Sequence, residues 1–308
     1  MDGLPQNLVP DTAIWQHTLR APINCVGVGL HSGRRVSLTL RPAEPGHGIV
    51  FRRLDLGRDI PARFDRVVDT RLSTVLGDAE WASARVGTVE HLLAALSALG
   101  IDNALVELDG PEVPALDGSA APFVFLIDCA GNVAQPAPRG RIEVRRVVRV
   151  TEGNAFAELR PAAPGARGLE MAMSIDFAAA AIGRQALSLH LSERSFRHEL
   201  AAARTFTLME EVAQLRAAGL AQGGSLDNAV VVDEARVLNP GGLRMPDEFA
   251  RHKLLDAIGD LALAGMPLCG RFFAHRSGHA LNNRLLRALF ADTSAWRENA
   301  SEAVSAAA

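Results

Sequence analysis

The sequence predicts a mixed α+β protein made of a duplicated two-domain unit. Each half begins with alternating apolar and polar residues, which is typical of half-buried strands, and later carries an amphipathic helical pattern. The length of 308 residues suits two domains. A polar, proline-rich segment at residues 134–139 interrupts the chain near its middle. We therefore expect a first domain at residues 1–137 and a second at residues 138–308.

A weak internal repeat relates the two halves. The matching features are residues 37–43 and 156–162, the glycines Gly48 and Gly168, and the stretches that begin with His91 and His252. Their common order favours a duplicated α+β unit over chance. It also predicts two related helices whose histidines face each other across a domain interface.

Charge and hydropathy exclude several classes of protein. The formal net charge of -3 comes from 32 basic and 35 acidic residues, which argues against broad binding to nucleic acid or to an anionic membrane. Apolar runs stay near ten residues, too short for a transmembrane segment. Cys25, Cys129 and Cys269 lie far apart, and no secretion signal is visible at the N-terminus. We expect a cytoplasmic protein, and a monomer.

The first motif, residues 27–33, contains three glycines and resembles a dinucleotide-binding fingerprint. A phosphate-binding loop of that kind must open a helix, however, and residues 34–40 alternate like a strand. We therefore expect a turn between two strands. This argues against a dinucleotide-dependent oxidoreductase.

The next informative segment, residues 87–96, predicts the start of a helix with Thr88 as its N-cap. Glu90 and His91 are adjacent and so do not share a helix face. His91 can therefore bind a metal while Glu90 acts as general base on water. The alternatives are an acidic residue favoured by the helix dipole and a buried core histidine.

Residues 252–260 predict a helix with two different faces. His252, Asp256 and Asp260 recur every four residues and line one face, while leucines and an isoleucine line the other. A histidine and an aspartate at this spacing can both bind one zinc ion. The alternative is a solvated face with a weak i,i+4 pair.

Together, His91, His252 and Asp256 form a set of two imidazoles and a carboxylate, the ligand number of a catalytic zinc site. Zinc suits these donors best, and iron or cobalt could substitute. The same helix holds Lys253, the one lysine beside 31 arginines. In a chain that otherwise uses arginine, a single lysine indicates a place for a compact ammonium group. The alternative is an ordinary surface residue.

The last motif, residues 277–283, predicts an exposed loop histidine, His279, just before a helix. Such a histidine suits proton transfer or the stabilisation of an oxyanion, and Asp260 is its expected partner. The alternative is a capping or solvent-facing residue. His275 lies in a predicted strand and receives no role.

With these motifs in view, the sequence resembles the UDP-3-O-acyl-N-acetylglucosamine deacetylase family, LpxC, the zinc enzymes of the committed step in lipid A synthesis. The matching stretches are residues 27–33, 83–103, 114–120, 203–206, 223–225, 251–260 and 277–279. About the first dozen residues and the tail after Trp296 fall outside the similarity, and the chain has no tyrosine, unlike many relatives.

The resemblance implies two domains, each a sheet layered with helices, with the active site between them. It implies hydrolysis of the N-acetyl group of UDP-3-O-acyl-N-acetylglucosamine to release acetate. The implied metal ligands are His91, His252 and Asp256. The implied catalytic residues are Glu90 as base, His279 as imidazolium, Asp260 as its partner, and Thr205, which polarises the amide oxygen.

The implied substrate-binding residues are Lys253, which contacts the nucleotide sugar, and Phe206, which lines the site. The fatty chain would enter an apolar passage at residues 208–228. Two other functions stay open on the residues alone: hydrolysis of a smaller amide with the same ligands, and metal-dependent binding without catalysis. The weakly polar tail at residues 300–308 is expected to fray, with a degradation signal as the alternative.

Overall fold

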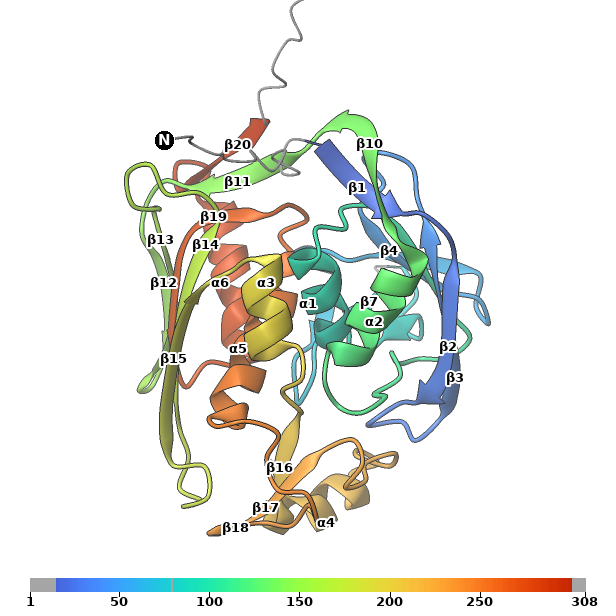
Figure 1. Cartoon of the computed structure of the whole chain (residues 1–308), viewed down its shortest axis with the longest axis vertical. Coiled ribbons are helices and arrows are strands. Elements are labelled where there is room, and N and C mark those ends of the chain that lie inside the picture. Colours follow the sequence, from blue (N-terminus) through green and yellow to red (C-terminus); the bar gives the residue numbers. More distant parts are fainter. Residues whose placement is uncertain (1–14, 79, 301–308) are drawn as a thin grey trace, which may run out of the picture.

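The computed structural model describes residues 15–78 and 80–300, and Figure 1 shows their arrangement in layers. Two sheets lie on the outside, and helices from both halves of the chain lie between them. The expectations for the N-terminus and for the tail after residue 300 concern residues outside this description. Within residues 15–78 and 80–300, no helix combines the length and apolar character needed to cross a membrane.

The sheet of the first half has five strands in the order β2-β3-β9-β4-β5. Only β4 and β9 pair in parallel. The strands are β2 (Ile23–Val28), β3 (Arg35–Pro42), β9 (Ala104–Leu108), β4 (Ile49–Arg53) and β5 (Arg58–Pro61). Alternation in β3 buries Val36, Leu38 and Leu40 completely, so one face of this sheet forms the core.

The second half repeats this arrangement, which confirms the predicted duplication. Its strands follow the order β12-β13-β19-β14-β15, and only β14 and β19 in this series pair in parallel. The strands are β12 (Val148–Glu152), β13 (Ala155–Arg160), β19 (Leu268–His275), β14 (Leu169–Asp176) and β15 (Arg184–His190). β11 (Gly140–Val144) joins the start of β19, and β20 (Trp296–Ala300) pairs with β11.

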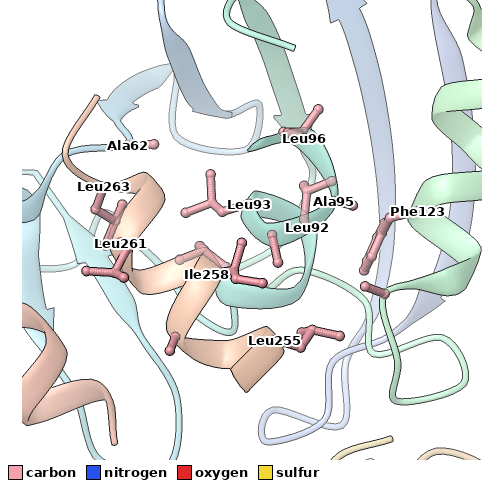
Figure 2. Packing of buried hydrophobic residues seen from close by; sticks show 14 of the residues in the cluster. Ala62, Leu92, Leu93, Ala95, Leu96, Phe123, Leu255, Ile258, Leu261 and Leu263 are labelled. Atoms are coloured by element: carbon pink, nitrogen blue, oxygen red, sulfur yellow. The ribbon is translucent and has the colours of Figure 1, made fainter. Parts of the chain in front are cut away.

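Four helices form the inner layers: α1 (Glu90–Ala98), α2 (Ala121–Ala130), α5 (Glu248–Ala262) and α6 (His279–Ala291). α1 is apolar on nearly all sides after its first two residues, as expected for a helix buried between layers. It packs against α5 through Leu92, Leu93, Ile258 and their neighbours (Figure 2). Each such leucine contributes about 1.5–3 kcal/mol through burial.

Smaller elements complete the structure. A three-stranded sheet consists of β6 (Val67–Asp69), β7 (Val75–Gly77) and β8 (Arg85–Val86), after the short helix η1 (Phe64–Arg66). A second consists of β16 (Phe206–Leu208), β17 (Val230–Asp233) and β18 (Arg236–Val237), next to α4 (Met209–Ala217). The one-turn α3 (Glu193–Ser195) leads into η2 (Phe196–Leu200). The β16–β18 unit projects from one end of the molecule (Figure 1).

Two predicted connections can be compared with the structure. Residues 29–34 form a turn between β2 and β3, closed by a hydrogen bond from Gly29 N to Arg34 O of 2.9 Å, as predicted. The proline-rich segment is not a free linker but the strand β10 (Asn132–Pro138), paired with β1 (Trp15–Leu19). Prolines are compatible with this strand because it lies at the edge of a two-stranded ribbon.

Candidate metal centre and active site

A cluster of three potential metal ligands forms where α1 and α5 meet. His91 lies in the first turn of α1, and His252 and Asp256 lie one turn apart on α5. Their ligand atoms lie within 4.8 Å of one another, and all three residues are buried. The sequence analysis predicted His252 and Asp256 from their spacing and His91 from the motif at the start of α1, and the repeat suggested that the two histidines face each other. Their ring centroids are 4.9 Å apart.

The distances in this cluster fit a tetrahedral metal ion. Asp256 Oδ1 lies 3.4 Å from His91 Nε2 and 3.3 Å from His252 Nε2. Two donors that bind one zinc ion at about 2.0–2.1 Å in tetrahedral geometry lie about 3.3–3.4 Å apart. Among the described residues, Asp256 Oδ1 is buried without a hydrogen-bond partner, as expected of an oxygen reserved for a cation.

The surroundings of His252 and Asp256 favour the protonation states that a metal requires. His252 Nδ1 lies 3.0 Å from the carbonyl oxygen of Ala203, which fixes the tautomer with Nε2 free to bind. Burial lowers the pKa of His252 to about 4. Burial alone would raise the pKa of Asp256, but His252 and Lys253 outweigh it and hold that pKa well below its usual value. A neutral imidazole and an ionised carboxylate are the forms that bind divalent cations.

Lys253 contacts this cluster directly. Its Nζ donates to Asp256 Oδ2 at 2.9 Å, so the ammonium group occupies the carboxylate oxygen that does not face the histidines. The Lys253 side chain is 18% exposed, which excludes the interpretation as an ordinary surface lysine. Its contact with a nucleotide sugar stays a prediction.

A second pair of titratable side chains lies beside the cluster. Glu90 Oε1 lies 3.8 Å from His279 Nε2, and both residues are buried. Burial raises the pKa of Glu90, an effect only partly opposed by His279 and His91. Burial alone would lower the pKa of His279, but Asp260 and Glu90 raise it to about 9. The pair therefore combines a potential proton acceptor with a cationic imidazolium at neutral pH.

Asp260 is the partner of His279, as predicted. His279 Nδ1 lies 2.9 Å from Asp260 Oδ2, and Asn282 Nδ2 donates to the same oxygen at 2.9 Å. The expectation that His279 lies in an exposed loop is wrong. It is the first residue of α6 and only 7% exposed, because Gly278 takes the N-cap position and α6 starts earlier than the apolar pattern suggested.

The prediction that Thr88 caps α1 is also wrong. The N-cap position belongs to Val89, and no side chain caps the helix there. Thr88 instead has a φ of 55°, and its hydroxyl donates to Glu112 Oε1 at 2.8 Å. Glu112 also accepts hydrogen bonds from the backbone N–H groups of His31 and Ser32. Glu112 therefore links the turn at residues 29–34 to the segment that delivers Glu90.

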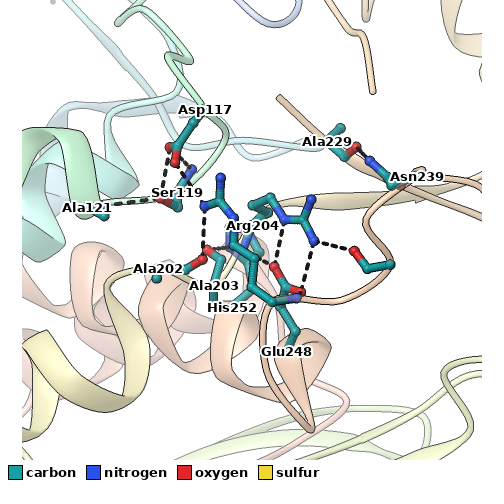
Figure 3. A network of polar contacts seen from close by, with 12 residues as sticks. Asp117, Ser119, Ala121, Ala202, Ala203, Arg204, Ala229, Asn239, Glu248 and His252 are labelled. Atoms are coloured by element: carbon teal, nitrogen blue, oxygen red, sulfur yellow. Dashed lines mark hydrogen bonds and ion pairs between the residues drawn. The ribbon is translucent and has the colours of Figure 1, made fainter. Parts of the chain in front are cut away.

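A buried ion pair fixes the segment that lies against His252 (Figure 3). Arg204 Nε donates to Glu248 Oε1 at 2.8 Å, and the backbone N–H of Arg204 donates to the same oxygen at 3.0 Å. Glu248 opens α5, the helix that carries His252 one turn later. This pair therefore holds the carbonyl group of Ala203 where it can orient the His252 ring.

Thr205 and Phe206, the remaining predicted site residues, follow Arg204. Thr205 N donates to the carbonyl oxygen of Gly118 at 2.8 Å. The centroid of the Phe206 ring lies 6.3 Å from that of the His252 ring and 4.9 Å from that of the Phe249 ring. Eight of the nine predicted site residues thus lie in or next to one cluster, and the ninth, Thr205, directly precedes Phe206 in the chain. A separate cavity of about 820 Å³, at the far end of α1 and α5, is lined by none of them.

Sequence reasoning missed several residues of this cluster. They are Thr74, Glu112, Arg204, Glu248 and Asn282. Arg204 and Asn282 lie within recognised motifs, residues 203–206 and 277–283, but the sequence analysis gave neither residue a role. Thr74 and Glu112 are single polar residues in irregular segments, where no periodicity marks them.

Comparisons with known proteins agree with the resemblance. A family model described as LpxC, UDP-3-O-acyl N-acetylglycosamine deacetylase, matches residues 16–291. The chain is similar to the UDP-3-O-acyl-N-acetylglucosamine deacetylase of Myxococcus xanthus strain DK1622, with 52% identity over 91% of this chain and 88% of that protein. The protein of the same name from Phenylobacterium zucineum strain HLK1 is 52% identical over 92% of this chain and 96% of its own length.

Proposed function

This chain belongs to the LpxC family, and we propose that it hydrolyses the N-acetyl group of UDP-3-O-acyl-N-acetylglucosamine, in lipid A biosynthesis, to UDP-3-O-acyl-glucosamine and acetate. One observation supports this above the others. The three potential metal ligands His91, His252 and Asp256 share a buried site with a proton acceptor and a cationic imidazolium, Glu90 and His279. That combination suits the hydrolysis of an amide.

We propose zinc as the bound ion, with iron(II) or cobalt as substitutes, held by His91, His252 and Asp256. When bound, such an ion would polarise the amide carbonyl and make water more acidic. Asp256 Oδ1, buried and without a hydrogen bond among the described residues, supports this assignment. Lys253 would hold the carboxylate in place through its other oxygen.

The proposed reaction proceeds in two steps that this chain's residues can serve. Glu90 accepts a proton from the attacking water as the water oxygen bonds to the acetyl carbon. His279 and Thr205 then stabilise the negative charge on the amide oxygen, and one such donor is typically worth about 3–4 kcal/mol of barrier. The C–N bond breaks as the amine receives a proton from Glu90 or His279. Acetate and the free amino sugar leave.

We propose that three features of the chain recognise the substrate. Phe206 would line the sugar site, and Lys253 would contact the nucleotide sugar. The insert at residues 208–228 would form the passage for the fatty chain. Met209 and Leu226 support this role because both are apolar yet 49% and 42% exposed.

Three further expectations are proposals as well. We propose that residues 1–137 and 138–308 are two domains, which the repeated sheets on either side of β10 support. We propose a cytoplasmic location, and the free state of Cys25, Cys129 and Cys269 supports a reducing compartment. We also propose that the protein is a monomer.

The test is acetate release from UDP-3-O-acyl-N-acetylglucosamine by the purified protein, compared with the sugar that lacks the acyl chain. We expect strong preference for the acylated substrate. Equal rates would indicate a general small-amide hydrolase, and no release with a full complement of metal would indicate a binding protein.

Glu90→Gln should lower kcat about 10²–10⁴-fold, because glutamine cannot accept the proton. Metal content, measured by elemental analysis, should stay at the wild-type level because Glu90 is not one of the ligands. Glu44→Gln, at an exposed position, is the matched control and should keep full activity. An unchanged rate in Glu90→Gln would remove Glu90 as the base.

A further inference from the structure

Thr74 lies in the loop between β6 and β7. It contacts Glu90 directly and is linked to His279 through Asp260. Its backbone N–H donates to Glu90 Oε2 at 3.1 Å. Its hydroxyl donates to Asp260 Oδ1 at 2.5 Å, and Asp260 in turn holds His279 Nδ1. Thr74 is only 2% exposed, so water does not compete for these bonds.

The four residues Glu90, Thr74, Asp260 and His279 form a ring in which three of the four links are hydrogen bonds. The ring runs from Glu90 through Thr74 and Asp260 to His279, and hydrogen bonds join each neighbouring pair. The open side lies between Glu90 Oε1 and His279 Nε2, which are 3.8 Å apart. That distance exceeds a hydrogen bond, yet one small group can lie about 2.8 Å from both atoms.

We propose that Thr74 is a positioning residue that keeps the carboxylate of Glu90 and the imidazolium of His279 apart, so that a reacting atom fits between them. The inference rests on the proposed function. Opposite charges 3.8 Å apart in a buried site attract each other strongly. A direct ion pair would occupy the acceptor oxygen of Glu90 and the donor nitrogen of His279. Thr74 holds Glu90 through Oε2, the oxygen not measured to His279, and it holds Asp260, which contacts the other ring nitrogen of His279.

Two further observations support this role. The carbonyl oxygen of Thr74 accepts a hydrogen bond from Val89 N at 3.4 Å, so the same residue also contacts the start of α1. Two residues earlier, Leu72 has a φ of 68°, which is unfavourable for a leucine. A strained backbone persists where the surrounding contacts fix it, and strained residues often occur at active sites.

The test compares three variants in the acetate assay. Thr74→Val removes the hydroxyl but keeps the shape and the backbone N–H, and we expect kcat to fall about 10–100-fold, as for small displacements of catalytic groups. KM and metal content should not change, because Thr74 is not among the metal ligands. Thr74→Ser restores the hydroxyl and should recover most of the turnover.

Thr18→Val is the matched control. Thr18 is also buried, at 6% exposure, and its hydroxyl donates to the carbonyl oxygen of Asn103 at 2.7 Å, in β1 and away from the cluster. We expect the two valine variants to lose similar amounts of thermal stability, while only Thr74→Val loses kcat. Should Thr74→Val not fold, Thr74→Ala removes the same hydroxyl without adding a methyl group.

The inference is overturned if Thr74→Val keeps full kcat, if Thr74→Ser is as slow as Thr74→Val, or if the loss follows loss of metal or a rise in KM. Failure of the proposed function looks different. In that case the wild-type protein itself releases no acetate from the acylated nucleotide sugar, whatever residue occupies position 74.

Discussion

Glu90 and His279 require opposite protonation states, and their environments provide them over a limited range of pH. Burial raises the pKa of Glu90, so its basic form is lost when pH falls through that raised value. Asp260 and Glu90 outweigh burial and raise the pKa of His279 to about 9, so its charged form is lost when pH rises through about 9. We expect a bell-shaped dependence of kcat on pH, measured between about pH 5 and 10.

The alkaline limb of that profile belongs to His279. His279→Gln should therefore lower kcat and abolish the decline near pH 9, while the acid limb stays. A decline that persists unchanged in His279→Gln would show that another group causes it.

At the level of single residues, the sequence predicted some from a repeating pattern and others, such as Glu90, His91 and His279, from short motifs. His252, Asp256 and Asp260 share a helix face because of their spacing, and all three side chains are buried on that face. Thr74 and Glu112 have no such pattern. Their roles depend on contacts with residues far away in the chain, and a single sequence does not reveal those contacts.

At the level of elements, Gly259 sets how closely α1 and α5 approach. A Cβ atom at this position would lie 2.0 Å from the carbonyl oxygen of Glu90, so only glycine allows this crossing. We expect Gly259→Ala to displace Glu90, to lower kcat, and to lower the free energy of unfolding by about 1–3 kcal/mol. Denaturant unfolding and the acetate assay measure the two effects.

Gly241→Ala is the control for that substitution, because a Cβ atom at Gly241 meets no atom within 4 Å and its φ is not in the positive range. It should leave both stability and kcat near the wild-type values. Wild-type kcat in Gly259→Ala would mean that α1 can shift without moving the base.

The elements also show which features local sequence patterns could not predict. A helix-start signal located α1 and periodicity located α5, but Thr88 was predicted to cap α1, and no prediction was made for Gly259. Both residues owe their positions to tertiary contacts, Thr88 with Glu112 and Gly259 with the backbone of Glu90. Local propensity carries no information about such contacts.

At the level of the whole molecule, the three potential metal ligands join the two halves of the chain, since His91 comes from the first and Asp256 from the second. Metal binding should therefore stabilise the folded protein, by about 2.7 kcal/mol when free metal exceeds its Kd one hundredfold. Thermal unfolding with zinc and with a chelator measures this gain.

His91→Ala should lose the stabilisation by zinc, whereas His47→Ala, at an exposed position, should retain it. A gain that survives in His91→Ala would place the stabilising metal elsewhere.

The duplicated architecture was predictable because both copies keep the same order of strand and helix signals. The pairing of β10 with β1 was not, since prolines at residues 136 and 138 suggested a break. An edge strand needs few backbone donors, so the composition that marks a linker also fits this position.

The position of Lys253 has a practical consequence for chemistry performed on the protein. Because no other side chain carries a primary amine, a reagent that acylates amines has one internal target, and that target touches a carboxylate of the metal cluster. The extent to which Lys253 is acylated, measured by mass spectrometry, would therefore report whether a ligand covers this part of the site.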